Sequence, residues 1–285
     1  MNYISVLTYN ILSSNLATLM TNERKNDNIV YSEYIMNNTT RFEKISLFIK
    51  ENIIINKDLI ICLQEVTEEW LILFAQLFSS LNYRYLNIQY GRIINGNMGV
   101  LIAYPNKFGI LKSEFYHVGQ HIKIKDKNSS YASGKTNIAI FLILEDKKIN
   151  FKFGIATYHM PCEPTIQEIG LLHSKLLYKK IISFMKYIPW ILTTDFNMIP
   201  NTLGYKYMIK HDIGCIWKDK LGYYPITNHS YINNFEFSGC IDYIFYNKNN
   251  LECKKIIIDK IDNIIPDEKQ PSDHIPIIAI FNLIL

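Results

Sequence analysis

Residues 190–197 read Trp190-Ile-Leu-Thr-Thr-Asp195-Phe-Asn197, an apolar segment that runs directly into a carboxylate and an amide. Residues two apart in a strand face the same side, so Asp195 and Asn197 are expected to point together at one ligand where the strand ends. Unpaired polar groups at the end of a buried strand are costly, so such groups pair with distant loops or bind something. Several other predicted strands of this chain end in the same way.

The composition indicates one folded domain over residues 1–285, because no linker or shift in composition divides the chain. Its hydrophobic content of 48% and aromatic content of 13% are sufficient for a large core, and 20% charged residues argues against disorder. A net charge of +4 permits an anionic partner without requiring one. The lysine pairs are scattered, which favours solvated faces over a dense nucleic-acid patch.

The five cysteines are odd in number and lie in neither CxxC nor metal-ligand spacing, which is typical of a reducing compartment. The sequence begins without a basic, apolar leader, and no apolar run reaches the length of a membrane span. We therefore expect a soluble intracellular protein with no membrane partner, and take the cytoplasm as the default location.

Hydrophobic periodicity predicts a mixture of strands and helices. Helices are expected over 41–55 with Thr40 as cap, after Thr67, from Pro164 to about Lys186, and over 203–210, while the segment from 11 to 35 looks irregular. Strands are expected over 3–9, 58–63, 84–89, 98–104, 113–118, 137–144, 151–157, 190–197, 241–246, 253–258 and 277–283. This order fits an α/β fold with two packed mixed β-sheets flanked by helices, a four-layer α/β sandwich.

Three polar residues follow predicted strands, and each has an ordinary alternative. Glu65 comes after an apolar strand, where its carboxylate is a hard oxygen ligand for Mg²⁺ or Mn²⁺, although such a residue is more often a surface charge. Asn10 is a weaker candidate because asparagine is common in turns. His159 is either a donor to a phosphate oxygen or an ordinary loop histidine.

Two motifs near the C-terminus are more specific. Asp242 lies inside an apolar strand, where an unpaired carboxylate is expensive, so we expect a metal, an arginine or a catalytic role. In Ser272-Asp273-His274 a carboxylate adjoins an imidazole, which can fix the tautomer of His274 or raise its pKa. By contrast, Gly134-Lys135-Thr136 imitates the end of a phosphate-binding loop but lacks the earlier glycine, so we interpret it as a loop before a strand.

Taken in order, these strand-end residues resemble the motifs of the endonuclease/exonuclease/phosphatase superfamily. The residues that carry the resemblance are Asn10, Gln64-Glu65, His159, Asp195-Phe-Asn197, Asp242 and Ser272-Asp273-His274. The sequence Phe237-Ser-Gly-Cys-Ile-Asp242-Tyr-Ile-Phe-Tyr246 resembles the corresponding sequences in one branch of the superfamily, which contains the carbon-catabolite-repressor-type deadenylases, nocturnin, angel and 2′-phosphodiesterase. The resemblance extends over nearly the whole chain.

In that branch a proline and a phenylalanine sandwich an adenine ring, and the matching residues here are Pro164 and Phe237. The ordinary alternative is that Phe237 belongs to the core and Pro164 starts a helix. Three residues depart from the family pattern: Thr194 stands in place of glycine, Tyr158 in place of threonine and Met198 in place of serine. These departures flank the site, so they affect the expected substrate fit more than the expected activity.

The resemblance implies a Mg²⁺-dependent phosphodiesterase or phosphatase, in which Mn²⁺ can substitute for Mg²⁺. Glu65, Asn10 and Asp242 would hold one or two metal ions, Asp195 would activate water, and Asn197 would position the water or the phosphate. His159 and His274 would donate to the phosphate, with Asp273 orienting His274.

The leading substrate is an adenylate-rich 3′ end of RNA, shortened with release of 5′-AMP. The alternatives are 2′,5′-oligoadenylate or an adenine dinucleotide, DNA-repair incision, and an inactive RNA-binding module. The sequence names no protein partner, and it leaves open whether segment 11–40 covers a substrate.

Overall fold

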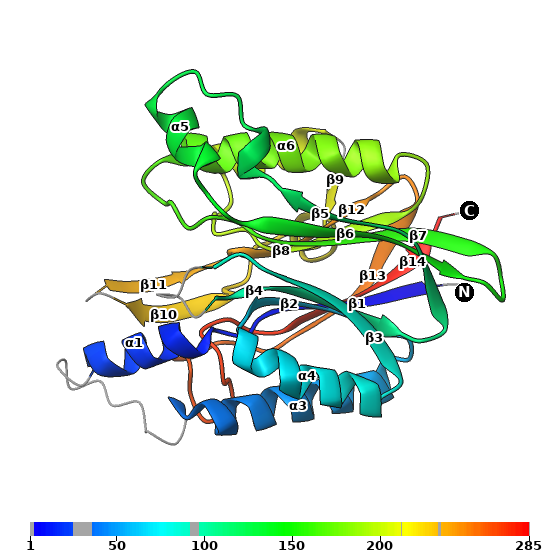
Figure 1. Cartoon of the computed structure of the whole chain (residues 1–285), viewed down its shortest axis with the longest axis horizontal. Helices are drawn as coiled ribbons and strands as arrows, with labels where there is room; N and C mark the ends of the chain where they lie inside the picture. Colours follow the sequence, from blue (N-terminus) through cyan, green and yellow to red (C-terminus); the bar gives the residue numbers. More distant parts are fainter. Residues whose placement is uncertain (1–2, 25–35, 92–96, 212, 233–234, 285) are drawn as a thin grey trace.

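Two six-stranded mixed β-sheets pack face to face in the computed structural model of the chain (Figure 1). The structure describes residues 3–24, 36–91, 97–211, 213–232 and 235–284. One sheet has the strand order β13-β14-β1-β2-β4-β3 and the other the order β5-β6-β7-β8-β12-β9, while β10 and β11 form a separate two-stranded ribbon. The sequence-based prediction of two packed mixed sheets is confirmed.

The strands are β1 (Tyr3–Asn10), β2 (Ile60–Val66), β3 (Tyr83–Gln89), β4 (Gly99–Pro105), β5 (Phe108–His117), β6 (Ile138–Asp146), β7 (Phe151–His159), β8 (Trp190–Asp195), β9 (Ile213–Cys215), β10 (Asn228–Ile232), β11 (Phe235–Gly239), β12 (Asp242–Asn247), β13 (Leu251–Ile258) and β14 (Ile277–Leu283). The pairs β1–β2 and β7–β8 are parallel, and the other neighbouring strands run antiparallel. Each sheet therefore carries one parallel pair near its centre.

Helices cover the outer face of each sheet and complete a four-layer sandwich. In Figure 1, α3 and α4 lie below the β1-containing sheet, and α6 lies above the sheet that contains β7 and β8. The helices are α1 (Ser14–Arg24), α3 (Asn38–Ile55), α4 (Glu68–Ser80), α5 (Lys127–Ser133), α6 (Gln167–Met185) and α7 (Leu203–Lys210), with a 3₁₀ turn over Gly119–His121 and a π-helical turn over Trp217–Leu221.

The alternation of side chains in β1 decides which residues face the interior of the sandwich. Ile4 and Val6 belong to the core between the sheets, whereas Leu7 and Tyr9 belong to the core under α3 and α4. Because side chains in a strand alternate with a period of two, Asn10 continues the face of Ile4 and Val6. The same alternation brings Gln64 of β2 inside, where its Nε2 donates to Thr157 Oγ1 of the facing sheet at 2.9 Å.

Several local expectations are corrected by the structure. The segment 11–35, expected to be irregular, contains α1 over Ser14–Arg24; residues 11–13 are irregular as expected, and residues 25–35 lie outside the described residues. Helix α3 begins at Asn38, and Asn37 caps it by accepting from the Thr40 main-chain N–H at 3.1 Å, so Thr40 is not the cap. A capping side chain that accepts from the main-chain N–H three residues later is the common geometry at the start of a helix.

Two further differences lie close to the strand-end residues. Helix α6 begins at Gln167 rather than at Pro164, which occupies a turn before it. The ribbon β10–β11 was not expected from the sequence, although Gly134 does end α5 in a loop before β6, as predicted. Among the described residues, no helix combines the length and apolar character that a membrane crossing needs.

A buried histidine links α6 to β7 and α5. The Nε2–H of His173 lies 3.1 Å from the Ala132 carbonyl oxygen, which can only accept, so Nδ1 accepts from the Tyr158 hydroxyl at 2.7 Å. Burial lowers the pKa of His173 from 6.5 to about 4. The imidazole is therefore neutral in the folded protein at neutral pH.

Because of this histidine, the free energy of unfolding depends on pH. Between pH 6.5 and 4 the unfolded chain binds a proton at His173 that the folded chain does not bind, so the free energy of unfolding falls as the pH falls, by about 3 kcal/mol across that window. We predict that His173→Gln, which keeps a donor and an acceptor but does not titrate, flattens this dependence in urea unfolding. The exposed His121→Gln is the control, and an unchanged slope in His173→Gln would contradict the assignment.

Candidate active site

The carboxyl ends of the two parallel strand pairs meet at one edge of the sandwich. Asn10 ends β1 beside Gln64 of β2, and His159 ends β7 beside Asp195 of β8. The antiparallel strand β12 starts at this edge, and its first residue, Asp242, pairs with Asp195. Strands from both sheets thus place polar side chains at the same edge of the sandwich.

A bulge in β2 turns Glu65 toward this edge. Ile61 and Leu63 face the helices, so regular alternation would send Glu65 to the same side. The pairing of β2 with β4 instead shifts register between Gln64 and Val66, Glu65 has a φ of 60°, and Val66 takes the helix-facing position. A bulge that re-aims one side chain is a recurrent device next to active sites.

Asn10 bridges two of the carboxylates. Its Nδ2 donates to Glu65 Oε1 at 3.0 Å and to Asp195 Oδ2 at 2.9 Å, and its Oδ1 accepts from the Leu12 main-chain N–H at 3.0 Å. The Ser13 main-chain N–H donates to Glu65 Oε2 at 2.9 Å, which fixes the other oxygen of this carboxylate. In this orientation Asn10 presents its amide nitrogen to the carboxylates, and its role as an oxygen ligand of a metal stays a prediction.

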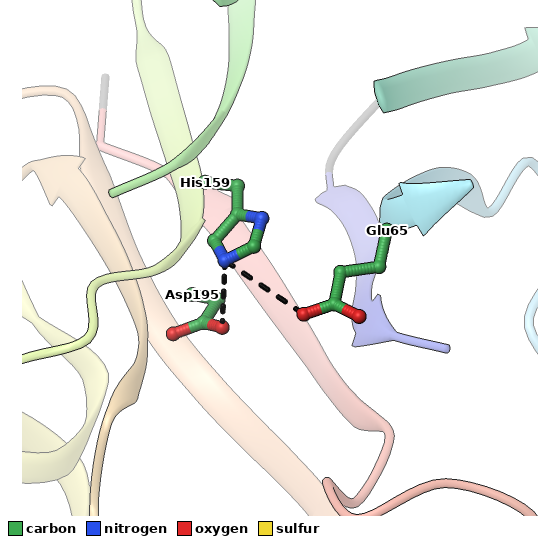
Figure 2. A group of neighbouring side chains, drawn as sticks. All are labelled: Glu65, His159 and Asp195. Atoms are coloured by element: carbon green, nitrogen blue, oxygen red, sulfur yellow. Dashed lines mark ion pairs between the residues drawn. The ribbon is translucent and has the colours of Figure 1, made fainter. Parts of the chain in front are cut away.

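His159 lies between Glu65 and Asp195 (Figure 2). Its Nε2 is 3.4 Å from Asp195 Oδ2 and 3.9 Å from Glu65 Oε1. Its Nδ1 is 2.8 Å from the hydroxyl of Tyr90, whose pKa burial raises well above its usual range. Ionised carboxylates only accept, so a neutral His159 carries its proton on Nε2, directed at Glu65 and Asp195, and its Nδ1 accepts from the Tyr90 hydroxyl.

Asp242 is the carboxylate that orients His274. Its Oδ2 lies 2.8 Å from His274 Nδ1, and His274 Nε2 lies 3.7 Å from Asp195 Oδ2. The Thr227 hydroxyl accepts from the Asp242 main-chain N–H at 3.1 Å and thereby positions the start of β12. The expectation that the neighbouring Asp273 orients His274 is corrected, because Asp273 Oδ2 accepts from Asn228 Nδ2 at 3.3 Å.

Burial and mutual repulsion shape the protonation of the site. Burial raises the pKa of Asp195 to about 6, although His274 and His159 lower it. Burial by itself lowers the pKa of His274, but the nearby carboxylates of Asp242, Asp273 and Asp195 outweigh this and hold it well above its usual range. His274 is therefore protonated and offsets part of the negative charge.

Asn197 holds Asp195 through the main chain. The Asn197 N–H donates to Asp195 Oδ1 at 2.9 Å, its Nδ2 donates to the Met160 carbonyl at 2.8 Å, and its φ is 47°. This side chain thus fastens the loop after β8 to the loop after β7. Its role in positioning water or phosphate stays a prediction.

Arg41 is a structural part of the site that the sequence analysis did not identify. It is fully buried, and its guanidinium donates to the carbonyls of Ile11 and Leu12 and, at 2.7 Å, to the carbonyl of Pro271. It therefore fastens the loop after β1 to the loop that carries His274. Burial lowers its pKa to about 10, so it remains charged at neutral pH.

The donor set fits a divalent cation. Two groups of ligand atoms each lie within 4.8 Å of one another: Glu65, His159 and Asp195 form the first, and Asp195, Asp242 and His274 form the second. Asp195 belongs to both groups. Clustered buried carboxylates repel one another unless a cation lies between them, and oxygen ligands of this type suit Mg²⁺ and Mn²⁺.

The two residues expected to hold an adenine ring lie on different segments. Pro164 is exposed in the turn before α6, and Phe237 is half-buried on β11, with its ring close to the Cα of Gly239. Their pairing around a base stays a prediction. Two of the three residues that depart from the family pattern are accommodated: the Tyr158 hydroxyl bonds His173, and Met198 fills the space beside Gly170 and Gly204. The buried hydroxyl of the third, Thr194, has no hydrogen-bond partner among the described residues.

A sandwich of two mixed sheets with acidic and histidine side chains at one edge defines a class of phosphoester-cleaving folds, and comparison with known proteins identifies it. Residues 7–274 match the Endonuclease/Exonuclease/phosphatase family, so this chain belongs to that family.

Curated relatives support the branch that the sequence suggested. The probable CCR4-Not complex 3′-5′-exoribonuclease subunit Ccr4 of Enterocytozoon bieneusi (strain H348) is 29% identical over 209 residues, which cover 62% of this chain and 43% of that protein. The corresponding Ccr4 subunit of Schizosaccharomyces pombe is 21% identical over 216 residues, covering 58% of this chain and 31% of that protein. The chain thus spans less than half of the length of these relatives.

Solved structures share the fold. ANGEL2, described as a 2′,3′-cyclic phosphatase and solved with adenosine-2′,3′-vanadate, has a TM-score of 0.78 at 18% identity, covering 99% of this chain and 96% of that chain. The human nocturnin catalytic domain with bound sulfate has a TM-score of 0.71 at 22% identity, covering 99% and 94%. These likenesses are evidence for the fold.

The contact between Tyr90 and His159 gives a first prediction for the site. In nitrogen-15 spectra of labelled histidine above the titration of the ring, wild-type His159 should show an unprotonated Nδ1 and a protonated Nε2. Tyr90→Phe removes the donor and should shift His159 toward a mixture of tautomers. The control is Tyr187→Phe, since Tyr187 is 84% exposed. A spectrum of Tyr90→Phe identical to wild type would refute the assignment.

The position of Arg41 gives a second prediction. Arg41→Lys keeps the charge but cannot reach all three carbonyls at once, so the free energy of unfolding should fall by about 2–4 kcal/mol. Chemical denaturation measures this loss. Arg84→Lys, on the exposed side of β3, is the matched control and should change stability by less than about 0.5 kcal/mol. Equal losses of stability in the two variants would show that the hydrogen bonds of the Arg41 guanidinium do not contribute to the free energy of unfolding.

Proposed function

We propose that this chain is a Mg²⁺-dependent phosphodiesterase that shortens the adenylate-rich 3′ end of RNA and releases 5′-AMP. The convergence of Glu65, Asp195 and Asp242 with His159 and His274 at one edge of the sandwich carries this proposal. The family membership supports hydrolysis of a phosphoester, and the exoribonuclease activity for which the Ccr4 relatives are named supports RNA as the substrate.

Mg²⁺ held by Glu65, together with Asp242 and Asn10, would supply charge stabilisation of the phosphoryl oxygens. Asp195 is suited to accept a proton from water because burial raises its pKa to about 6 and the Asn197 N–H fixes one of its oxygens.

The two histidines suit the role of donors to the phosphate. A neutral His159 directs its Nε2–H into the site, since Tyr90 holds the other nitrogen. His274, kept protonated by Asp242 and neighbouring carboxylates, would donate to an oxygen that gains charge. Pro164 and Phe237 would hold the terminal adenine, which supplies the preference for adenylates.

The proposal is tested by turnover with Mg²⁺ and with EDTA, on labelled RNA that ends in oligo(A), the same RNA with oligo(U), 2′,5′-oligoadenylate and NADPH. We expect stepwise shortening of the oligo(A) tail alone. Cleavage confined to the 2′,5′ linkage or the dinucleotide would replace the substrate while keeping the chemistry. Equal turnover in EDTA and in Mg²⁺ would contradict the proposed metal dependence. No turnover of any of these substrates would favour a DNA substrate or a binding module.

Two substitutions test the assigned roles. Asp195→Asn should lower the rate at least about a thousandfold, within the range of a lost general base, and Glu65→Gln should weaken Mn²⁺ binding measured by titration calorimetry. Without metal, both variants should melt at or above the wild-type temperature, because each removes one of several buried carboxylates that repel one another. Asp262→Asn, on an exposed loop carboxylate, is the control. Wild-type turnover by Asp195→Asn would remove Asp195 from the role of base.

A further inference from the structure

A cavity of about 850 Å³ opens beside His159, outside the cluster of carboxylates. Tyr90 and Asn137 form the wall that it shares with the catalytic edge. The Tyr90 hydroxyl contacts His159 Nδ1 at 2.8 Å, and Asn137 Nδ2 donates to the His159 carbonyl at 2.9 Å. The cavity therefore adjoins the place where a scissile phosphate would lie.

The far wall of the cavity comes from α5 and the loop that follows it. Figure 1 shows α5 beside the start of α6, at the same end of the sandwich as the β10–β11 ribbon. Tyr131 lines the cavity and is 49% exposed as a whole residue. Its hydroxyl donates to Glu163 at 2.9 Å, so the ring is held in place.

A lysine completes this wall. Lys135 Nζ lies 4.1 Å from the centroid of the Tyr131 ring and forms an ion pair with Glu163. Lys127 also lines the cavity, so among the described lining residues two lysines exceed the one acidic residue, Glu163. A fixed aromatic face beside cationic groups is the combination that binds a nucleobase together with its phosphate.

Volume and position agree with this chemistry. Small-molecule sites usually measure about 300–1,000 Å³, and the cavity is within that range. Lys135 belongs to the Gly134-Lys135-Thr136 sequence, which fails as a phosphate-binding loop because it follows a helix end. Its ammonium instead lies over the Tyr131 ring, where the two side chains can contact the same ligand.

We propose that this cavity is a second nucleotide subsite. It binds the penultimate nucleotide of the RNA, which precedes the scissile phosphate, with its base on Tyr131 and its phosphate near Lys135 and Lys127. This inference rests on the proposed function, since it takes the polymer of that proposal as the ligand. It predicts that the chain recognises at least two consecutive nucleotides, so a dinucleotide binds more tightly than a mononucleotide.

Equilibrium binding tests the subsite without turnover. In an Asp195→Asn background with Mg²⁺, the affinities for 5′-AMP and for the 5′-phosphorylated diadenylate are compared by calorimetry. We expect a gain of about tenfold for the second nucleotide, equal to about 1.4 kcal/mol. Tyr131→Ala should abolish most of this gain, whereas Tyr131→Phe, which keeps the ring, should retain it.

The matched control is Tyr187→Ala, because Tyr187 is also an exposed tyrosine with a lysine ammonium, that of Lys186, over its ring at 4.8 Å. This control should leave the gain unchanged. A second nucleotide that adds nothing to the affinity of the Asp195→Asn protein, or adds the same when Tyr131→Ala is also present, would overturn the subsite.

Hydrolysis of bis(p-nitrophenyl) phosphate by the wild-type chain is measured in parallel. Its absence would count against the proposed phosphodiesterase, while the binding comparison would still decide whether the cavity holds a nucleotide.

Discussion

The site depends on how several buried carboxylates are held at one edge of two packed sheets. Like charges in a dry environment repel, so Glu65, Asp195 and Asp242 remain together only because hydrogen bonds and cationic groups offset the repulsion. Asn10 places its amide between two of them, and protonated His274 lies against the third. A bound divalent cation would complete this balance.

The rigidity of the edge comes from residues outside the catalytic set. Arg41 connects the loop after β1 with the loop before β14, and Ser272 donates to the Asn10 carbonyl at 2.7 Å. Tyr90 fixes one face of His159 and also lines the neighbouring cavity. The proposed catalytic edge and the proposed nucleotide subsite therefore share a supporting side chain, which is a common requirement for sites that need fixed orientation.

Tyr158, one of the departures from the family pattern, has a structural partner in this chain. Tyr158 bonds to buried His173, which in turn contacts the carbonyl of Ala132 in α5. The residue that precedes His159 is thus connected to the helix that carries Tyr131. The tyrosine at 158, where the family pattern has threonine, fits a chain in which α5 and β7 are joined through the core, and the carboxylate cluster of Glu65, Asp195 and Asp242 is retained beside it.

Much of the fold and site could be predicted from the sequence, because side chains in a strand alternate between its two faces and unpaired polar groups are costly to bury. Polar residues at the ends of apolar strands are therefore recognisable as candidate site residues. Asp195, Asp242 and His274 and the two-sheet fold were accessible in this way. The tertiary structure alone decided that Asp242, not Asp273, orients His274, that a bulge turns Glu65 inward, and that Arg41 and Tyr90 support the edge. These depend on register and on contacts between distant segments, which no local pattern encodes.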